Sequence, residues 1–257
     1  MLPQDQTLEV WGELACFTRP ELKVERFSYP VITPSAARGI YDAIYCKPRE
    51  FRWQITCIEV TARSDCEHRQ PSYIALRRNE VKDRAPSPRI IAQWMDGRAE
   101  PEPIYADGDK SATGSDKKGR TQRQTMALKN VRYRLHGQIR PWPGFEGSLR
   151  GLEAQFRRRA ASGKCIYQPY FGCREFPAYF ELVEPDAHQP EPLLLDEDIG
   201  PMVYDVFDLS RPGDAYAPVH VSLFDASIRG GVMHVPDFAS DAVLKPGGKR
   251  EVTGDAN

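Results

Sequence analysis

The chain has 257 residues, 40% of them hydrophobic and 28% charged, with a formal net charge of −1. This composition is typical of a folded globular protein and argues against a wholly disordered one. No apolar stretch approaches the roughly 20 residues that a membrane helix requires, and the N-terminus lacks a signal-peptide pattern. We therefore expect a soluble cytoplasmic protein that has no membrane partner.

The near-zero net charge conceals two segments of opposite sign. Eight basic residues lie between positions 110 and 134, where Asp116 is the only acid. Ten acids lie between positions 181 and 214, where Arg211 is the only Lys or Arg. Binding of a polyanion depends on the local field rather than on total charge, so the basic segment is a candidate nucleic-acid contact. Two ordinary solvated faces explain the same pattern equally well.

The cysteines and histidines predict no metal centre and no cofactor. The six cysteines form no C-x-x-C pair, and no Cys/His cluster has the spacing of a zinc site. Most cysteines lie in apolar runs, which predicts small core residues in a reducing compartment. The histidines are scattered, and only His136 lies in a segment that suggests a role in binding.

The N-terminal part of the chain predicts a strand, a helix and a second strand. Residues 7–17 alternate well enough to form the first strand. Thr33 and Pro34 form a helix start, because a capping side chain precedes proline at the first helical position, and Pro48 ends the helix. The expected buried stripe of this helix is Ala37, Ile40, Tyr41 and Ile44. A neighbouring face contains Arg38, Asp42 and Tyr45. The strand over residues 51–60 places on one face Phe51, Trp53, Ile55 and Cys57.

The middle of the chain contains extended segments of different character. Residues 72–81 are predicted to be extended, whereas residues 86–124, rich in Pro, Gly, Ser, Asp and Lys, predict a long mobile loop. Residues 131–140 show the cleanest alternation in the chain, with an apolar face opposite a basic one. No acid interrupts the basic row, which favours an RNA-facing strand over an ordinary solvated sheet face. The row consists of Arg132, Arg134, His136 and Arg140.

The C-terminal half predicts one further helix and several strands. Residues 149–161 form the helix, which ends in a basic run that the helix dipole favours in any case. Strands are expected over residues 177–183, 201–209 and 218–224. The order of elements fits an α+β fold of the ferredoxin-like (RRM-like) type with an enlarged hairpin. We expect this domain over residues 1–184 with its insertion over 86–124, a small β-rich extension over 185–244, and a disordered tail over 245–257.

Four ordered blocks of sequence carry a resemblance to a known family. They are FTRPELKVERFSYPVITPSAARGIYDAIYCKP (17–48), LRRNEVK (76–82), RQTMALKNVRYRL (123–135) and QFRRRAASGKCIYQPYFGCREFPAYFEL (155–182). In this order they closely resemble the Cas-five family of CRISPR-associated proteins, in its type I-C branch of the RAMP superfamily. The similarity spans roughly residues 7–209, and the 86–124 insertion and the C-terminal tail diverge. An unrelated RRM-like protein would have to match all four blocks by chance.

The resemblance implies a ferredoxin-like core with a C-terminal β extension and a role in antiviral defence. It implies a subunit of the type I-C Cascade complex that holds the 5′ handle of the crRNA, with the backbone subunits and the large subunit as partners. Target DNA is then a partner through the assembled complex. Members of this branch commonly also cut the pre-crRNA repeat hairpin without a metal, when a ribose 2′-OH attacks the adjacent phosphate and leaves a 2′,3′-cyclic phosphate.

The cutting reaction requires a base, a group that stabilises the phosphorane charge, and an acid for the leaving oxygen. The resemblance implies that a tyrosine and a Lys-His pair perform it. Tyr45 matches the tyrosine, but Gly151 and Leu152 stand at the positions of the Lys-His pair. Arg150, Lys164 and His136 are possible substitutes that no sequence pattern supports. A phenol by itself is a poor general base, because tyrosine side chains lose their proton only near pH 10. Tyr45 therefore suits stacking on a nucleotide.

Two hypotheses follow from the sequence. The first is an RNA-binding subunit that grips the crRNA through phosphate contacts and base stacking, and the second is an endoribonuclease with a rearranged catalytic set. We favour binding, with Tyr45 as the only candidate catalytic residue and no metal. The candidate RNA-binding residues are Arg19, Lys23, Arg26, Arg38, Tyr45, Arg77, Arg78, Lys129, Arg132, Arg134, His136, Arg157, Arg158 and Arg174.

Overall fold

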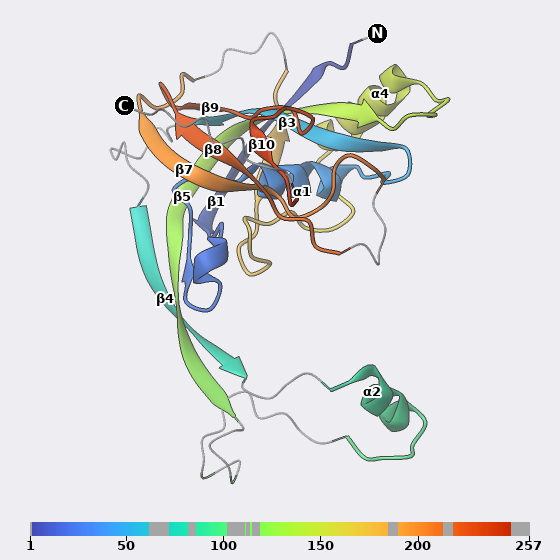
Figure 1. Cartoon of the computed structure of the whole chain (residues 1–257), viewed down its shortest axis with the longest axis vertical. Coiled ribbons are helices and arrows are strands. Elements are labelled where there is room, and N and C mark those ends of the chain that lie inside the picture. Colours follow the sequence, from blue (N-terminus) through green and yellow to red (C-terminus); the bar gives the residue numbers. More distant parts are fainter. Residues whose placement is uncertain are drawn as a thin grey trace.

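The computed structural model describes residues 2–61, 72–81, 86–101, 111, 114, 119–184, 190–212 and 218–247. Within them the chain forms a mixed α/β structure with two sheets, and every strand pair except β2–β5 is antiparallel (Figure 1). The described elements are β1 (Asp5–Ala15), the 3-10 helix η1 (Pro20–Leu22), β2 (Arg26–Phe27), α1 (Pro34–Ile44), β3 (Phe51–Val60), β4 (Ser72–Val81), α2 (Pro88–Met95), β5 (Arg120–Pro141), α4 (Leu149–Ala161), β6 (Tyr179–Leu182), β7 (Glu197–Asp205), β8 (Ser222–Ile228), β9 (Val232–His234) and β10 (Val243–Leu244). None of the helices in these ranges is long and apolar enough to cross a membrane.

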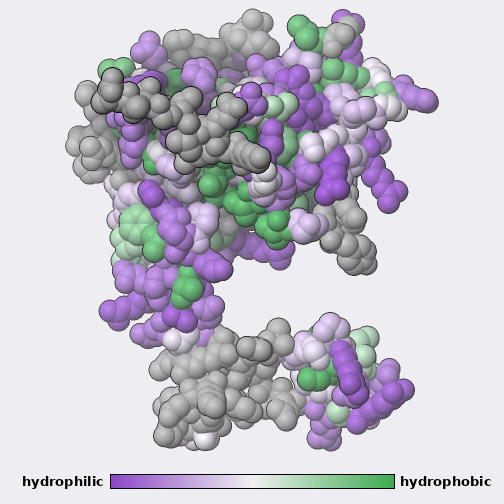
Figure 2. Space-filling model, viewed as in Figure 1, coloured by the Kyte–Doolittle hydropathy of each residue, from purple (hydrophilic) through white to green (hydrophobic). Residues whose placement is uncertain are grey.

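Strand β5 is the centre of the first sheet. Its C-terminal half lies between β1 and β3 in the order β6-β1-β5-β3-β9, and its N-terminal half pairs with β2 and β4. The β4–β5 pair extends from the rest of the molecule as a two-stranded arm (Figure 1). Hydrophilic residues cover most of the face in view, including much of this arm (Figure 2). The second sheet has the order β10-β8-β7.

The prediction of a loop over residues 86–124 is wrong in two places, where the structure has a helix and a strand. Helix α2 covers part of it, capped by the Ser87 side chain, which accepts from the Ile90 N–H at 3.3 Å and is followed by proline. This start signal has the same form as Thr33–Pro34. The central strand begins at Arg120 rather than near residue 131, because β4 provides a hydrogen-bonding partner for a segment that has no clear alternation of its own. The rest of the predicted loop, over residues 102–110, 112–113 and 115–118, lies outside the described residues, as does the predicted tail beyond residue 247.

Helices α1 and α4 carry the apolar residues that pack on the first sheet. The predicted stripe of α1 is confirmed, since Ala37, Ile40, Tyr41 and Ile44 are at most 1% exposed. The Tyr41 ring lies 4.7 Å from Trp53 of β3 and 5.5 Å from Phe156 of α4, measured between ring centroids. Its hydroxyl donates to the carbonyls of Gln6 and Leu135 at 2.7 and 2.8 Å, so the buried phenol is fully paired.

A β-bulge changes which face of β3 each residue occupies. The prediction placed Cys57 on the core face with Phe51, Trp53 and Ile55. The register of β3 shifts between Ile55 and Cys57, and Ile58 becomes the next fully buried residue. An extra residue in one strand reverses the alternation beyond it. Cys57 therefore lies on the polar face of the sheet, opposite His136 of β5.

The second sheet is joined to α1 by a buried ion pair. Arg38 of α1 donates to the carboxylate of Asp205 at 2.7 and 3.2 Å and also pairs with Asp42. Asp205 is 1% exposed and accepts further hydrogen bonds from the backbone N–H groups of Val206 and Phe207, which ends β7. The predicted strands over residues 201–209 and 218–224 are accordingly displaced to β7 and β8, which pair from Glu197–Ile228 to Asp205–Ser222. Arg38, which was predicted to contact RNA, forms ion pairs with Asp42 and Asp205 at this junction.

Replacing Asp205 with Ala should lower the free energy of unfolding by about 3 kcal/mol, because it leaves the Arg38 guanidinium and two backbone N–H groups without their acceptor. Urea denaturation followed by circular dichroism measures the change. Asp225→Ala, the same substitution at an exposed position of β8, is the matched control and should change stability by less than about 0.5 kcal/mol. Equal stability of the two variants would show that the ion pair does not hold the second sheet to α1.

Candidate nucleic-acid interface

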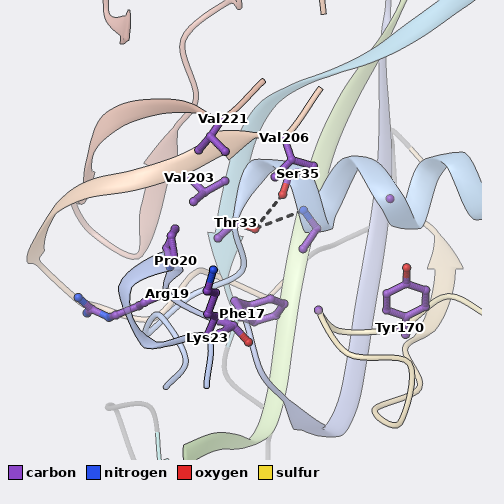
Figure 3. Close-up of a pocket in the computed structure, with 14 residues that line it drawn as sticks. Phe17, Arg19, Pro20, Lys23, Thr33, Ser35, Tyr170, Val203, Val206 and Val221 are labelled. Atoms are coloured by element: carbon purple, nitrogen blue, oxygen red, sulfur yellow. Dashed lines mark hydrogen bonds between the residues drawn. The ribbon is translucent and has the colours of Figure 1, made fainter. Parts of the chain in front are cut away.

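Helix α1 has a hollow at each end. The first, the N-terminal pocket, has a volume of about 550 Å³ and lies between η1, the first turns of α1 and the second sheet (Figure 3). Its basic lining residues among the described part of the chain are Arg19 and Lys23. Small or apolar side chains form most of the remaining wall, among them Phe17, Pro20, Ala36, Val203, Val206 and Val221.

The capped start of α1 forms the polar side of the N-terminal pocket. Thr33 Oγ1 accepts from the Ala36 N–H at 3.3 Å and lies 3.4 Å from Ser35 Oγ (Figure 3). The guanidinium of Arg19 lies 4.8 Å from the centroid of the Tyr29 ring and extends away from the valines of the wall, so it stands at the rim of the pocket (Figure 3). A helix N-terminus and two cations favour an anion, and an apolar wall beside them favours a flat ring. Together these groups suit a nucleotide.

The loop after β1 and the loop before β6 close this pocket at a position that requires glycine. Gly172 has a φ of +76°, and a Cβ on it would lie 2.2 Å from the carbonyl oxygen of Cys16.

Two predicted RNA-binding residues lie in this region. Arg26 donates to Glu175 Oε1 at 2.7 Å and to Cys173 Sγ at 3.3 Å, whereas Arg174 is exposed.

The second hollow, the C-terminal pocket, has a volume of about 490 Å³ and lies where α1 ends against α4. It brings Tyr45 together with Gly151 and Leu152, an adjacent pair about one hundred residues further along the sequence. These are the positions that the sequence resemblance assigns to catalysis. The other lining residues are Lys47, Glu50, Phe145, Gly147, Ser148 and Gln155.

Tyr45 is held firmly in the C-terminal pocket. Its backbone N–H caps α1 by donating to the Tyr41 carbonyl at 2.9 Å, and its carbonyl accepts from Trp53 Nε1 at 2.9 Å. Its ring packs on Phe51 at 5.4 Å between centroids and is 8% exposed. Arg159 of α4 donates to the Ile44 carbonyl at 2.6 Å, where a cation is favoured by the helix dipole.

Lys47 and Glu50 are functional candidates that the sequence reasoning missed, although Lys47 lies in the block that carries the resemblance. The Lys47 ammonium donates to both carboxylate oxygens of Glu50 at 2.9 and 3.0 Å, and Lys47 lines the same pocket as Tyr45. The hydrogen bond to Glu50 raises the pKa of Lys47, so the group stays protonated. It can stabilise negative charge near Tyr45 but cannot serve as a base.

The two positions of the absent Lys-His pair differ in the space around them. A Cβ on Gly151 would meet Ser148 Cβ at 3.5 Å, an ordinary van der Waals contact, whereas Leu152 is 5% exposed and part of the core. None of the proposed substitutes, Arg150, Lys164 and His136, is among the described residues that line this pocket. The described protein groups gathered around Tyr45 thus include a cation but no imidazole.

The comparison with protein families identifies the chain. The Cas5d model, described as CRISPR-associated protein (Cas_Cas5), matches residues 7–238. The chain belongs to the Cas5d family. It is 36% identical over 241 residues to the CRISPR pre-crRNA endoribonuclease Cas5d of Thermus thermophilus, and the match covers 89% of this chain and 90% of that protein. It is 35% identical over 246 residues to the Mannheimia succiniciproducens protein of the same name, covering 93% and 97%.

A solved structure supports the fold of this Cas5d-family chain. A crystal structure of a CRISPR-associated protein aligns with a TM-score of 0.59 and 18% sequence identity, and the alignment covers 93% of this chain and 96% of that one. At this level of identity the likeness concerns the fold alone.

The basic row on β5 of this Cas5d-family chain is a set of ion pairs. Arg132 donates to Glu9 of β1 at 2.6 Å, and Arg134 and His136 contact the two oxygens of Glu59 of β3 at 2.6 and 2.7 Å. Arg134 has a side chain that is only 7% exposed. The expectation that no acid interrupts the row holds along the strand but fails across the sheet, because neighbouring strands place glutamates beside the arginines. A role of this row in RNA binding stays a prediction.

The remaining predicted residues are distributed over two other elements. Arg77 and Lys129 are exposed on the β4–β5 arm, where Arg78 donates to the Val24 carbonyl at 3.1 Å. On α4, Arg157 pairs with Glu184 and Arg158 with Gln155. The structure therefore groups Arg19 and Lys23 in one pocket but does not bring all fourteen predicted residues to one surface.

Replacing Arg134 with Ala should lower the free energy of unfolding by about 2 kcal/mol, because Glu59 loses a partner in a half-buried position. Arg77→Ala, at an exposed position of β4, is the matched control and should leave stability within about 0.5 kcal/mol of the wild type. Both changes can be measured by denaturant unfolding. An Arg134→Ala variant as stable as the control would restore the interpretation of an open basic row.

Proposed function

We propose that this Cas5d-family chain is the RNA-binding subunit of a type I-C Cascade complex and holds the 5′ handle of the crRNA. The observation that carries the proposal is the N-terminal pocket, in which Arg19 and Lys23 flank an apolar wall at the start of α1. A phosphate fits the cations and the helix start, and a base fits the wall. Single-stranded RNA is recognised in this way, by charge along the backbone and by stacking of exposed bases.

The finer description of the fold belongs to the same proposal. Strands β1, β3, β5 and β6, with α1 after β1 and α4 after β5, have the β-α-β-β-α-β order of a ferredoxin-like core. In the sheet, β6 lies beside β1, and β5 lies between β1 and β3. We assign this RNA-binding domain to residues 1–184, with the insertion over 86–124, and the β-rich extension to residues 185–244.

The proposed partners follow from the assembly. They are the crRNA and its pre-crRNA repeat, the backbone and large subunits of Cascade, and target DNA through the assembled complex, in the cytoplasm. The exposed arginines and lysines of the β4–β5 arm, of α4 and of the loop at Arg174 are proposed to extend the RNA contact beyond the N-terminal pocket. Arg38 and Arg134 support that surface from within the fold through their ion pairs.

Binding of the cognate repeat RNA should weaken when Arg19 and Lys23 are both replaced with Glu. The slope of the logarithm of the binding constant against the logarithm of the salt concentration should decrease by about one for each phosphate that the variant no longer neutralises. Fluorescence anisotropy at several salt concentrations measures both quantities. Arg229→Glu, a charge reversal on an exposed residue beside Asp198, is the matched control and should leave affinity and slope unchanged. If the double variant behaves like this control, the N-terminal pocket is not the RNA site.

A second candidate function is cleavage of the pre-crRNA repeat to leave a 2′,3′-cyclic phosphate. The name of the two relatives favours it, and so does the C-terminal pocket, which presents the Tyr45 phenol beside the protonated Lys47. In such a reaction Lys47 would stabilise charge on the phosphorane and Tyr45 would position or protonate an oxygen. The group that removes the 2′-OH proton has no counterpart at Gly151 and Leu152, and binding is therefore the first proposal.

The purified chain should leave a cognate repeat hairpin intact in EDTA, whereas the double substitution Gly151→Lys and Leu152→His should produce cleavage. The added imidazole supplies the missing proton acceptor, because position 152 is largely buried but lines the C-terminal pocket, and position 151 has room for a longer side chain. Denaturing gels and end-group analysis detect the product, and Tyr45→Phe in the double variant is the control. Cleavage by the wild-type chain that Tyr45→Phe or Lys47→Ala abolishes would instead establish the second function.

A further inference from the structure

The polar face of the first sheet contains a cluster of three possible metal ligands. Cys57 Sγ, a carboxylate oxygen of Glu59 and a ring nitrogen of His136 all lie within 4.8 Å of one another, and all three residues are half-buried. None of them lines the N-terminal or C-terminal pocket. The cluster is therefore separate from both pockets, and it shares His136 with the basic row of β5.

The fold builds this cluster from two adjacent strands. Cys57 and Glu59 are two residues apart on β3 and so lie on the same face, and His136 is the direct partner of Cys57 on β5. The β-bulge after Ile55 is what turns Cys57 out of the core and onto this face. Because all three residues lie on paired strands, their backbone positions are set by the sheet rather than by a loop.

We propose that Cys57, Glu59 and His136 bind a divalent metal ion of the zinc class. A thiolate, an imidazole and a carboxylate together form a ligand set that zinc uses, and hard cations such as Mg²⁺ avoid sulfur. Ligands at zinc bond lengths of about 2.0–2.3 Å in a tetrahedral arrangement lie about 3.5 Å apart. The three donor atoms now lie within 4.8 Å of one another, and His136 Nε2 lies 2.7 Å from Glu59 Oε1.

Neighbouring groups already orient two of the ligands. Thr7 Oγ1 lies 3.3 Å from His136 Nδ1, and His136 Nε2 lies 2.7 Å from Glu59 Oε1. Arg134 holds the other oxygen of Glu59 at 2.6 Å, which leaves Oε1 directed at the imidazole. Ligands of bound metals are held in this way by hydrogen bonds from residues behind them. A metal ion between Nε2 and Oε1 would replace the hydrogen bond that now joins these two atoms.

The third strand of this face carries a histidine outside this group of three, and we assign it as the fourth ligand. His234 of β9 is the direct partner of Cys57 on the side opposite β5, and it is exposed. Side chains of directly paired residues have Cβ atoms about 4.5–5.5 Å apart, so the His234 ring can turn over Cys57. Four protein ligands make a structural site, which in this chain would join β9 of the C-terminal region to β3 and β5 of the first sheet.

The test uses the untagged full-length chain, stripped of metal with a chelator and titrated with Co²⁺ and then with Zn²⁺. One equivalent of Co²⁺ should give the visible spectrum of a tetrahedral site together with a thiolate-to-cobalt charge-transfer band, and Zn²⁺ should displace it. Zn²⁺ should also raise the thermal midpoint of the chain, because it binds the folded state. Absence of binding at one equivalent, or an octahedral spectrum without the charge-transfer band, overturns the proposal.

Three variants locate the site. Thr7→Val removes a group that orients a ligand, and it should weaken Zn²⁺ affinity by about 10- to 100-fold. Cys57→Ser removes a ligand itself, so it should weaken Zn²⁺ affinity by more than about 100-fold and should also remove the charge-transfer band. Cys165→Ser, at an exposed cysteine, is the control and should bind like the wild type. Equal binding by Cys57→Ser and this control would place the metal elsewhere and overturn the site.

The fourth ligand has its own test. His234→Ala should weaken Zn²⁺ affinity at least about 10-fold and change the intensity of the Co²⁺ spectrum, whereas unchanged affinity overturns the assignment of His234. Circular dichroism and unfolding of each variant without metal show whether the fold is intact, since His234 is exposed and Ser replaces Cys57 with little change of volume. The three-ligand site is judged on the Co²⁺ spectrum of the wild type, which depends on no substitution.

Discussion

The pairing of β5 is the constraint on which the rest of the structure depends. A strand of 22 residues must satisfy the hydrogen bonds of its backbone along its whole length, and it does so with β1 and β3 in one half and β4 in the other. The C-terminal half of the strand forms the platform on which α1 and α4 pack. The N-terminal half leaves the body of the molecule as an arm. One continuous strand thus connects the packed core to an exposed, largely hydrophilic surface.

Helix α1, packed on this half of the sheet, has one pocket at each of its ends. Its buried stripe fixes it against Trp53 and Phe156, and its capped start and its C-terminal Tyr45 then project into separate hollows. The first hollow combines positive charge with an apolar wall and suits a nucleotide. The second contains a tyrosine and a lysine without an imidazole among its described lining residues. The same helix therefore connects the pocket proposed for RNA binding with the pocket that contains Tyr45 and Lys47.

Charge in this protein is organised by pairing across elements rather than along the sequence. Within the basic row of β5, Glu9 of β1 pairs with Arg132 and Glu59 of β3 pairs with Arg134, while Arg140 lies 3.6 Å from Asp237. Asp205 pairs with Arg38 between α1 and the second sheet. Half-buried arginines need such partners because an unpaired charge away from water is costly. What remains available for a polyanion is the smaller set of cations at the pocket rim, on the arm and on the exposed loops.

The sequence by itself determined the family, through the four blocks of resemblance. It also determined the two helices that pack on the sheet and most of the strands of that sheet, because these depend on local signals. The signals are the Thr33–Pro34 cap, the 3.6-residue stripe of α1 and the alternation of β1 and of residues 131–140. It also placed Tyr45 and the missing Lys-His pair in one functional set through the family resemblance. Only the tertiary structure decided which charges are available, where Cys57 points and which residues share a pocket. The acids beside Arg132 and Arg134, the bulge in β3 and the meeting of Tyr45 with Gly151 all result from contacts between segments far apart in the chain, which no local pattern records.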